Sequence, residues 1–437
     1  MSYLEDYLSF ANVDEAPEMF YVWTAYASLS AAIGRRVWLP RPPAVIYPNI
    51  YLLLVGNAGE GKSQALGKMQ WVVAKAGDIQ MSSSVETPEG LLRYMAGDST
   101  KNPPVPSECV QMMTWPDGVV RETHSMMIVA NEFIDFIRTN MESWTGFLNN
   151  VYDQDVYKYR TKSSGTDNLV GPYVVLVGAI PTDVSKKLQD MDIINTGFGR
   201  RTIMQHGDRK FDRPMPRPPF TEEHEAARNR CVERLRALRF LKGAFTELPE
   251  AAKVYDDWYC EHSVTLIKRA TTATRGWLAS KPTQVTKIAI LDSLSDGDDL
   301  VITPKNYETA LAFLEYMETG LPKVFGGFGR NDLGPIAVQV LDYLTGIGEP
   351  RSFKTIQMKF FHSFSPGKAT AELTEVLQYL MNTDQVIEHK LTIGSMLAET
   401  VYLTPAALEK FRAESSAQQA AAVLNGMRLD SSGEVRP

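Results

Sequence analysis

Residues 50–63 constrain the fold of this chain more than any other segment. An apolar, strand-like run, Ile50–Val55, is followed directly by Gly56-Asn57-Ala58-Gly59-Glu60-Gly61-Lys62-Ser63, which matches the pattern GxxxxGK[ST]. Helix-forming residues come next. A glycine-rich turn between a strand and a helix lets backbone N–H groups surround a polyphosphate, and the helix N-terminus adds its own preference for anions. We therefore predict that residues 56–63, called the P-loop below, bind a nucleoside triphosphate.

The side chains of the P-loop have predictable roles. Lys62 can reach the β- and γ-phosphates, and the Ser63 hydroxyl can bind Mg²⁺. ATP and Mg²⁺ are the expected cofactors. The alternative is a glycine-rich turn that carries a surface lysine. The predicted nucleotide-binding residues are Gly56, Asn57, Ala58, Gly59, Glu60, Gly61, Lys62, Ser63, Gln64 and, from a later segment, Thr182.

Composition excludes several classes of protein. The chain has 437 residues, of which 44% are hydrophobic and 22% charged, as in an ordinary globular protein with two or three domains. A net charge of −7 argues against a polycationic DNA-coating protein, although local basic surfaces remain open. Cys109, Cys231 and Cys260 are far apart and lack metal-ligand spacing, so neither a disulfide framework nor a zinc site is indicated. Without a membrane-length apolar run or a signal-like N-terminus, we expect a cytoplasmic protein with no membrane partner.

The order of apolar runs predicts an α/β fold class. Strand candidates at 126–130, 173–180 and 201–205 alternate with helices, which indicates a mainly parallel sheet around the P-loop strand. Residues 97–121 read as an exposed loop or hairpin inserted into this sheet. A final run of three helices and a hairpin has the order of a winged helix-turn-helix. The predicted segments are 1–48 (N-terminal helices), 49–215 (P-loop ATPase core), 216–330 (a helical lid with helices at 222–240, 249–270, 282–295 and 304–325), 331–412 (winged helix) and 413–437 (flexible tail).

Hydrolysis needs a carboxylate close to the metal and the attacking water. Glu132 follows the strand candidate 126–130 and is the predicted catalytic residue, with Asp135 as a second choice. Its neighbour is Asn131, where many such ATPases carry Asp. The predicted metal site is therefore Ser63, Asn131 and Glu132, with water. The alternative is that Glu132 only caps the following helix.

A cation must also stabilise charge in the transition state. Arg200 and Arg201 lie in Gly197-Phe198-Gly199-Arg200-Arg201, predicted as a tight loop before a strand, and are candidate catalytic residues that would act on a neighbouring subunit's nucleotide. The alternative is a loop of solvated arginines. Thr182 or Asp183 would lie near the γ-phosphate as a sensor. Three further cations, Arg275, Lys281 and Lys287, are on or before a helix that was expected to cover the nucleotide.

Two segments carry residues suited to DNA. Aromatic and basic residues mix at 144–162, which permits base stacking and phosphate contacts in a central channel, although core aromatics beside a solvated basic strand explain the pattern equally well. The winged helix offers Lys354, Lys359, Lys368, Lys390 and His389, but its expected recognition helix carries Glu372 and Glu375. Protein contacts are therefore as plausible as DNA contacts.

With these residues in place, the chain resembles a P-loop domain family of unknown function from phages and mobile elements, similar to primase-associated replicative helicases. The succession of P-loop, acidic strand end, polar strand end, arginine loop, strand and helical lid also resembles the AAA+ and superfamily 3 helicase layout. The resemblance covers about residues 1–320. Besides the P-loop, it depends on Tyr47–Tyr51, Thr87–Leu91, Asn131–Phe133, Phe147–Asp153, Tyr159–Lys162, Ile180–Pro181 and Gly197–Arg201.

The resemblance implies an ATP-dependent replicative DNA helicase in a bacterial host cell. It implies a hexameric ring on single-stranded or forked DNA, with Arg200 or Arg201 as an arginine finger and with a separate primase or polymerase as partner. Asn131 departs from the usual acid. Two alternatives remain: a replication initiator or helicase loader, and a DNA-sensing or packaging ATPase of a defence or phage assembly.

Overall fold

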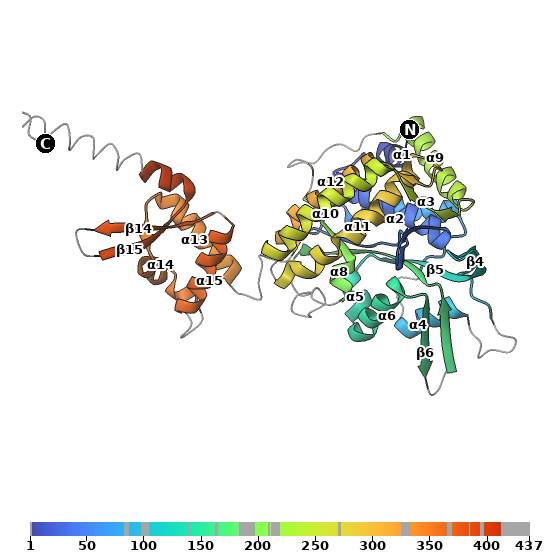
Figure 1. Cartoon of the computed structure of the whole chain (residues 1–437), viewed down its shortest axis with the longest axis horizontal. Helices are drawn as coiled ribbons and strands as arrows, with labels where there is room; N and C mark the ends of the chain where they lie inside the picture. The colour runs from blue at the N-terminus through green and yellow to red at the C-terminus, as the bar shows by residue number, and fades with distance from the viewer. Residues whose placement is uncertain are drawn as a thin grey trace, which may run out of the picture. The chain divides into compact units, whose positions relative to one another are not determined.

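The computed structural model describes residues 2–82, 87–97, 105–138, 140–161, 165–182, 197–208, 210, 219–269, 272–324, 333–364, 369–383, 385–393 and 397–411, so the predicted tail at 413–437 lies outside the described residues. The chain forms two compact units, Met1–Gly326 and Gly327–Pro437 (Figure 1). The segments predicted as N-terminal helices, ATPase core and lid share one hydrophobic core, which extends from Tyr3 to Val324.

A five-stranded sheet in the order β4-β5-β8-β3-β9 organises the larger unit. Four strands run parallel, and only β4 is antiparallel to its neighbour β5. The expectation of an α/β fold with a mainly parallel sheet is confirmed. The segment 97–121, predicted as an exposed loop or hairpin, contains β4 and the first residues of β5, and these two strands pair as an antiparallel hairpin. The strands are β3 (Tyr51–Val55), β4 (Val110–Thr114), β5 (Val120–Ala130), β8 (Tyr173–Ile180) and β9 (Thr202–His206).

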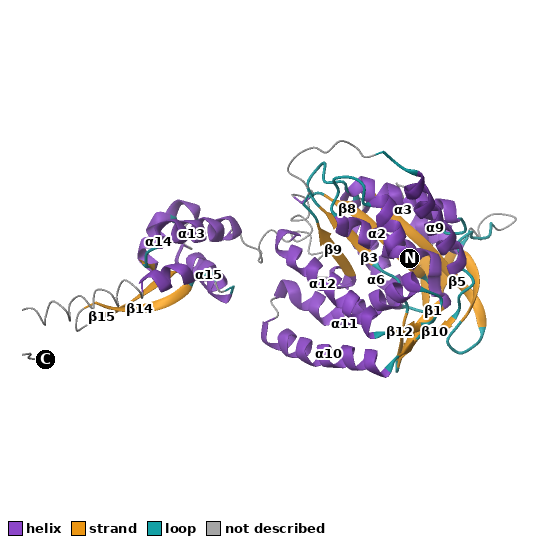
Figure 2. Ribbon diagram, turned by 90° about the horizontal axis from the view of Figure 1, so that it is seen from above, coloured by secondary structure: helices purple, strands orange, loops and turns teal. Residues whose placement is uncertain are grey.

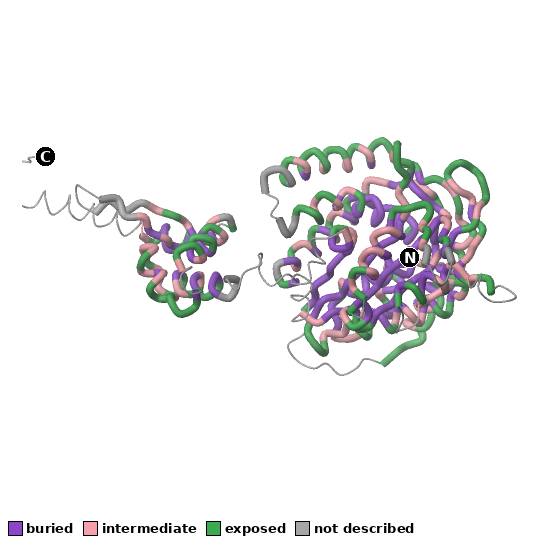
Figure 3. The backbone as a smooth tube through the Cα atoms, turned by 90° about the horizontal axis from the view of Figure 1, so that it is seen from below, coloured by how far each residue is buried: buried purple, intermediate pink, exposed green. Residues whose placement is uncertain are grey.

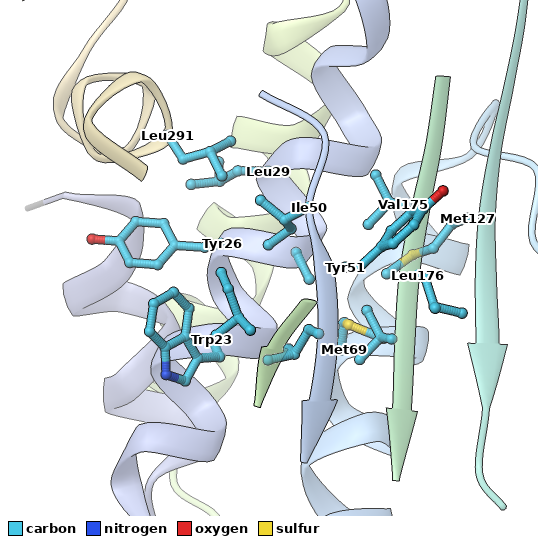
Figure 4. Packing of buried hydrophobic residues seen from close by; sticks show 14 of the residues in the cluster. Trp23, Tyr26, Leu29, Ile50, Tyr51, Met69, Met127, Val175, Leu176 and Leu291 are labelled. Carbon is cyan, nitrogen blue, oxygen red and sulfur yellow. The ribbon is translucent and has the colours of Figure 1, made fainter. Parts of the chain in front are cut away.

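The helix α2 (Glu18–Ile33) is central to the core because it is apolar around most of its circumference. It packs against α1 (Tyr3–Ala11), α3 (Lys62–Ala76) and α9 (Glu222–Leu238). Figure 4 shows Trp23, Tyr26 and Leu29 of α2 beside Ile50, which precedes β3. The polar atoms of Trp23 and Tyr26 both form hydrogen bonds: Trp23 Nε1 donates to Gln205 Oε1 at 2.7 Å, and Tyr26 Oη donates to Asp292 Oδ1 at 2.8 Å. In Figure 3 the buried segments fill the interior of this unit.

Three long helices, α10 (Pro249–Arg269), α11 (Thr272–Asp296) and α12 (Pro304–Val324), lie side by side (Figure 2). The predicted start of a helix at Pro282 is wrong, since that helix, α11, begins ten residues earlier. Proline lacks the N–H that would bond the carbonyl of Leu278 four residues before it. His262 Nε2 lies 2.8 Å from that carbonyl oxygen, so a ring N–H from α10 replaces the missing backbone donor. The helix therefore continues through the proline.

Smaller elements surround this core. Thr87 caps α4 as predicted, its Oγ1 accepting the Gly90 N–H at 3.1 Å. None of the helices in the described part of the chain is both long and apolar enough to cross a membrane. These smaller elements are η1 (Gly34–Arg36), β1 (Val37–Arg41), β2 (Ala44–Ile46), α4 (Pro88–Ala96), α5 (Phe133–Arg138), α6 (Met141–Asp153), β6 (Val156–Thr161), β7 (Gly165–Val170), α8 (Gly197–Arg201), β10 (Gly243–Ala244), β11 (Thr246–Glu247) and β12 (Val301–Ile302).

In the described residues, the smaller unit has three helices, further helical residues at 405–411 and a three-stranded sheet in the order β13-β15-β14. Its own core contains Val340, Ile356 and Leu377, one from each helix. The order of elements is the one predicted from the sequence, with an additional short strand before the second helix. The elements are α13 (Leu333–Ile347), β13 (Arg351–Ser352), α14 (Phe353–Lys359), η2 (Phe361–Ser363), α15 (Ala369–Asn382), β14 (Ile387–Ile393) and β15 (Leu397–Leu403).

Candidate nucleotide-binding site

The P-loop connects the buried strand β3 to helix α3, which begins at Lys62. Two of its glycines have backbone angles that other residues rarely adopt: φ is +87° at Gly59 and +80° at Gly61. Gly61 also has no room for a side chain, because a Cβ there would collide with Ala16 in the segment between α1 and α2. Both glycines are thus required by local geometry, one for conformation and one for conformation and space.

Within the loop, Lys62 turns back onto backbone carbonyls. Its Nζ donates to the oxygen of Gly56 at 2.5 Å and to that of Asn57 at 2.8 Å. Asn57, Ala58, Gly59, Ser63 and Gln64 are exposed. The ammonium group and the Ser63 hydroxyl are therefore near the loop opening, where phosphate and metal would have to bind.

Three residues predicted to act on the nucleotide of the same chain, Thr182, Asn131 and Glu132, follow strands that end at this edge of the sheet. Ile180, the last residue of β8, pairs with Val55 at the start of the P-loop, so Thr182 follows immediately beside it. Ala130 pairs with Gly178 of β8, which places Asn131 and Glu132 one strand farther along this edge. Both side chains are exposed there. Their oxygens, with that of Ser63, are of the kind that Mg²⁺ prefers, so the donor set fits the predicted metal.

The second-choice residue Asp135 lies on α5, where it forms an exposed ion pair with Arg138 at 3.9 Å. Asp183 lies outside the described residues.

A cavity of about 470 Å³ lies at the end of β9, the strand that pairs with β3. Gly207, which lines it, donates its N–H at 3.0 Å to the carbonyl of Val55, the residue directly before the P-loop. The volume of the cavity is within the range of small-molecule sites. Burial lowers the pKa of His206, and the ion pair with Lys323 lowers the pKa of Asp208. The walls are Pro17–Met19, Gln205–Asp208 with Lys210, and Tyr316, Thr319, Gly320 and Lys323 of α12.

This cavity was not predicted. The helix predicted to cover the nucleotide is α11, whereas α12 lines the cavity. Lys281 instead forms an ion pair with Glu318 at 2.8 Å. Lys287 is buried, and its Nζ donates to the Asn49 carbonyl at 2.9 Å and to Asn49 Oδ1 at 2.7 Å, at the start of β3 and away from the P-loop. Arg275 is exposed on α11. A signal for α12 existed in Tyr316, Thr319 and Lys323, which recur on one helical face.

The segment 197–201 is a short helix, α8, and the predicted loop is wrong. Phe198 explains the difference: it is buried and stacks on Phe133 at 5.6 Å between ring centroids, which anchors the turn. The Thr202 hydroxyl donates to the Phe198 carbonyl at 2.8 Å and stabilises its end. A buried aromatic residue in a short Gly-rich segment thus favours a packed helical turn.

The two arginines of α8 differ in environment. Arg201 is 14% exposed, and its Nη2 and Nε donate to Asp153 Oδ2 at 2.5 and 2.9 Å. Its Nη1 also donates to the Gly197 carbonyl at 2.9 Å. Arg200 is exposed. Because β9 is parallel to β3 and α8 precedes β9, both arginines lie at the amino edge of the sheet, about 17 Å from the P-loop edge at 3.3 Å per residue.

The aromatic segment divides into core and surface. Trp144, Phe147 and Tyr152 are buried, so the interpretation as core residues holds for them. Tyr157 and Tyr159 are half-buried and line a cavity of about 170 Å³ with Glu89 and Asn150. Lys158 on β6 is exposed, whereas Lys162 and the side chain of Arg160 lie outside the described residues.

Two of the predicted DNA-contacting cations of the smaller unit lie on its described surface. Lys354 and Lys359 are exposed on α14, and the His389 ring lies 6.4 Å from that of Phe411. The described Glu375 is exposed on α15, and Glu372 is half-buried. Lys368 and the side chain of Lys390 lie outside the described residues.

Comparison with models of known protein families finds no match to this sequence, and comparison with curated proteins finds no significant match.

Proposed function

We propose that this chain is an ATP-dependent replicative DNA helicase of a phage or mobile element, which moves along single-stranded DNA as a ring. One observation carries the proposal: the P-loop, Thr182 and Glu132 come from three adjacent parallel strands and meet at one edge of the sheet. ATP would bind with its phosphates at the P-loop and its nucleoside in the cavity at the end of β9. Mg²⁺, bound by Ser63 with Asn131 or Glu132 and water, would supply charge neutralisation at the phosphates.

The roles of the chain's own residues follow from their positions. Lys62 would exchange the carbonyls of Gly56 and Asn57 for phosphate oxygens. Glu132 would orient the attacking water and accept its proton. Thr182, between the two, would contact the γ-phosphate.

An arginine finger supplied by Arg200 or Arg201 would act on the nucleotide of a neighbouring subunit. Arg200 and Arg201 lie at the amino edge of the sheet, too far from the P-loop of their own chain to contact its nucleotide. Arg201 already pairs with Asp153, whereas Arg200 is exposed. We therefore assign the finger to Arg200 and a positioning role to Arg201. This arrangement supports a ring with nucleotide sites between subunits.

The test is a fork-unwinding assay with the wild type and Lys62→Ala. The helicase proposal expects ATP-dependent strand displacement that the variant lacks. Binding of ATP and DNA without displacement would refute it. Measuring particle mass with ATP and single-stranded DNA tests the ring separately, since a strict monomer would eliminate the trans-acting arginine.

The surface of α15 favours a second candidate, a replication initiator or helicase loader. This helix exposes Thr374, Glu375 and Gln378 in the part that would enter a DNA groove, with no cation among the described exposed residues. Such a surface suits a protein partner better than a phosphate backbone. The unwinding assay separates the two candidates, because a loader would bind ATP without displacing a strand.

A further inference from the structure

The P-loop holds a carboxylate of its own. Glu60 Oε2 accepts the backbone N–H of Asn57, and Oε1 accepts the Asn57 side-chain Nδ2 at 3.0 Å. The Glu60 N–H in turn donates to the Asn57 carbonyl at 3.3 Å. Three hydrogen-bonding groups of Asn57 and two of Glu60 are therefore satisfied within the loop itself.

This carboxylate lies deep in the turn. A Cβ built on Gly56 would collide with Glu60 Oε2, so the carboxylate contacts the backbone at the first residue of the loop. Glu60 is half-buried, although Ala58 and Gly59 beside it are exposed. Its oxygen takes a backbone N–H of the turn, the kind of donor that P-loops offer to phosphate.

Lys62 and Glu60 both form hydrogen bonds to residues at the start of the loop. The lysine Nζ donates to the carbonyls of Gly56 and Asn57, while the glutamate accepts from the N–H and side chain of Asn57. A polyphosphate would compete with both contacts, since its oxygens seek the N–H donors and the ammonium group. The carboxylate opposes polyphosphate binding further, because two anions at short distance repel each other.

We propose that Glu60 determines the nucleotide affinity of this P-loop: its carboxylate accepts an N–H that would otherwise bind phosphate, and it has to leave before the phosphates bind. This inference rests on the proposed nucleotide site. The ligand class is a polyphosphate with Mg²⁺, and the effect belongs to the phosphate chain rather than to the base.

The test measures binding of ATP, ADP and tripolyphosphate, each with Mg²⁺, by calorimetry to the full chain. Glu60→Gln keeps the size of the side chain and removes its charge. We expect all three ligands to bind Glu60→Gln about tenfold more tightly than they bind the wild type. This ratio corresponds to the loss of one charge-assisted hydrogen bond. Glu250→Gln, which changes an exposed glutamate on α10, is the charge-matched control and should bind like the wild type.

Glu60→Ala is a second variant, needed in case the glutamine side chain of Glu60→Gln also bonds to Asn57. Glu60→Ala should likewise bind the three ligands more tightly than the wild type does. Circular dichroism verifies that each variant is folded. Equal or weaker binding of tripolyphosphate by both Glu60 variants would overturn the inference while leaving the nucleotide site intact. Failure of the wild type and of every variant to bind any of the three ligands would instead refute the proposed function, and the inference with it.

Discussion

Lys287 gives the sharpest prediction about stability. It is buried, and desolvation lowers its pKa from 10.5 to about 7, against the opposing effect of Asp153. Its Nζ lies 3.8 Å from the Tyr152 ring centroid and donates twice to Asn49, which a neutral amine can also do. The unfolded chain holds the lysine proton up to about pH 10.5. The folded chain gives it up near pH 7, so the free energy of unfolding should rise with pH between these values.

The magnitude follows from these two pKa values. The charge costs the folded state about 4 kcal/mol at pH 7 and about 2 kcal/mol at pH 9, so the wild type should gain about 2 kcal/mol between them from this residue. Lys287→Met removes the titration. It also leaves the Asn49 oxygens without this donor, at a cost of about 1–3 kcal/mol that is the same at both pH values.

The assay is urea unfolding of both proteins at pH 7 and pH 9. The stability of the wild type relative to Lys287→Met should increase by about 2 kcal/mol at the higher pH, while contributions from other titrating groups cancel in the difference. Lys242→Met, at an exposed lysine after α9, controls for the loss of a positive charge. Parallel pH profiles for the wild type and Lys287→Met would refute the reasoning.

Three further predictions concern single side chains. Arg201→Ala should lower the free energy of unfolding by about 1 kcal/mol because it removes the hydrogen bonds of this largely buried arginine to Asp153 and to the Gly197 carbonyl, whereas Arg200→Ala should lower ATPase activity at unchanged stability; equal melting shifts in calorimetry would contradict this assignment. Glu132→Gln should bind ATP like the wild type but hydrolyse it at least a hundredfold more slowly, and a wild-type rate of phosphate release would remove its catalytic role. Cys260 is exposed whereas the other two cysteines are buried, so one thiol should react with a thiol reagent in the native protein and three after unfolding; fast reaction of all three would show that the core is open.

Contiguous patterns could be predicted from the sequence. The strand, turn and helix around the P-loop are encoded by successive residues, and the capping of α4 by Thr87 is equally local. The position of Glu132 was also accessible, because carboxyl ends of parallel strands meet at one edge. Local patterns of this kind need no knowledge of the partner that packs on them.

Features that depend on distant partners could not be predicted. Pro282 reads as a helix start, and only His262 on another helix allows α11 to continue through it. Lys287 was predicted to open a helix over the nucleotide, yet the packing of α11 on the start of β3 buries it against Asn49. The cavity beside the P-loop combines α12 with residues near position 18. Its existence follows from packing of elements that the sequence separates by hundreds of residues.

The location of α2 has a consequence for synthesis of the chain. This helix is buried on most sides, yet its Tyr26 donates a hydrogen bond to Asp292 of α11. Leu4 of the neighbouring helix α1 also donates its N–H to α11, to Ser295 Oγ at 2.9 Å. During translation the apolar surface of α2 therefore leaves the ribosome well before the helices that cover it. Such long-range contacts slow folding and leave the nascent chain prone to aggregation. Products that terminate before α12 should expose this helix, so the larger unit should become soluble only when residues up to about Val324 have been made.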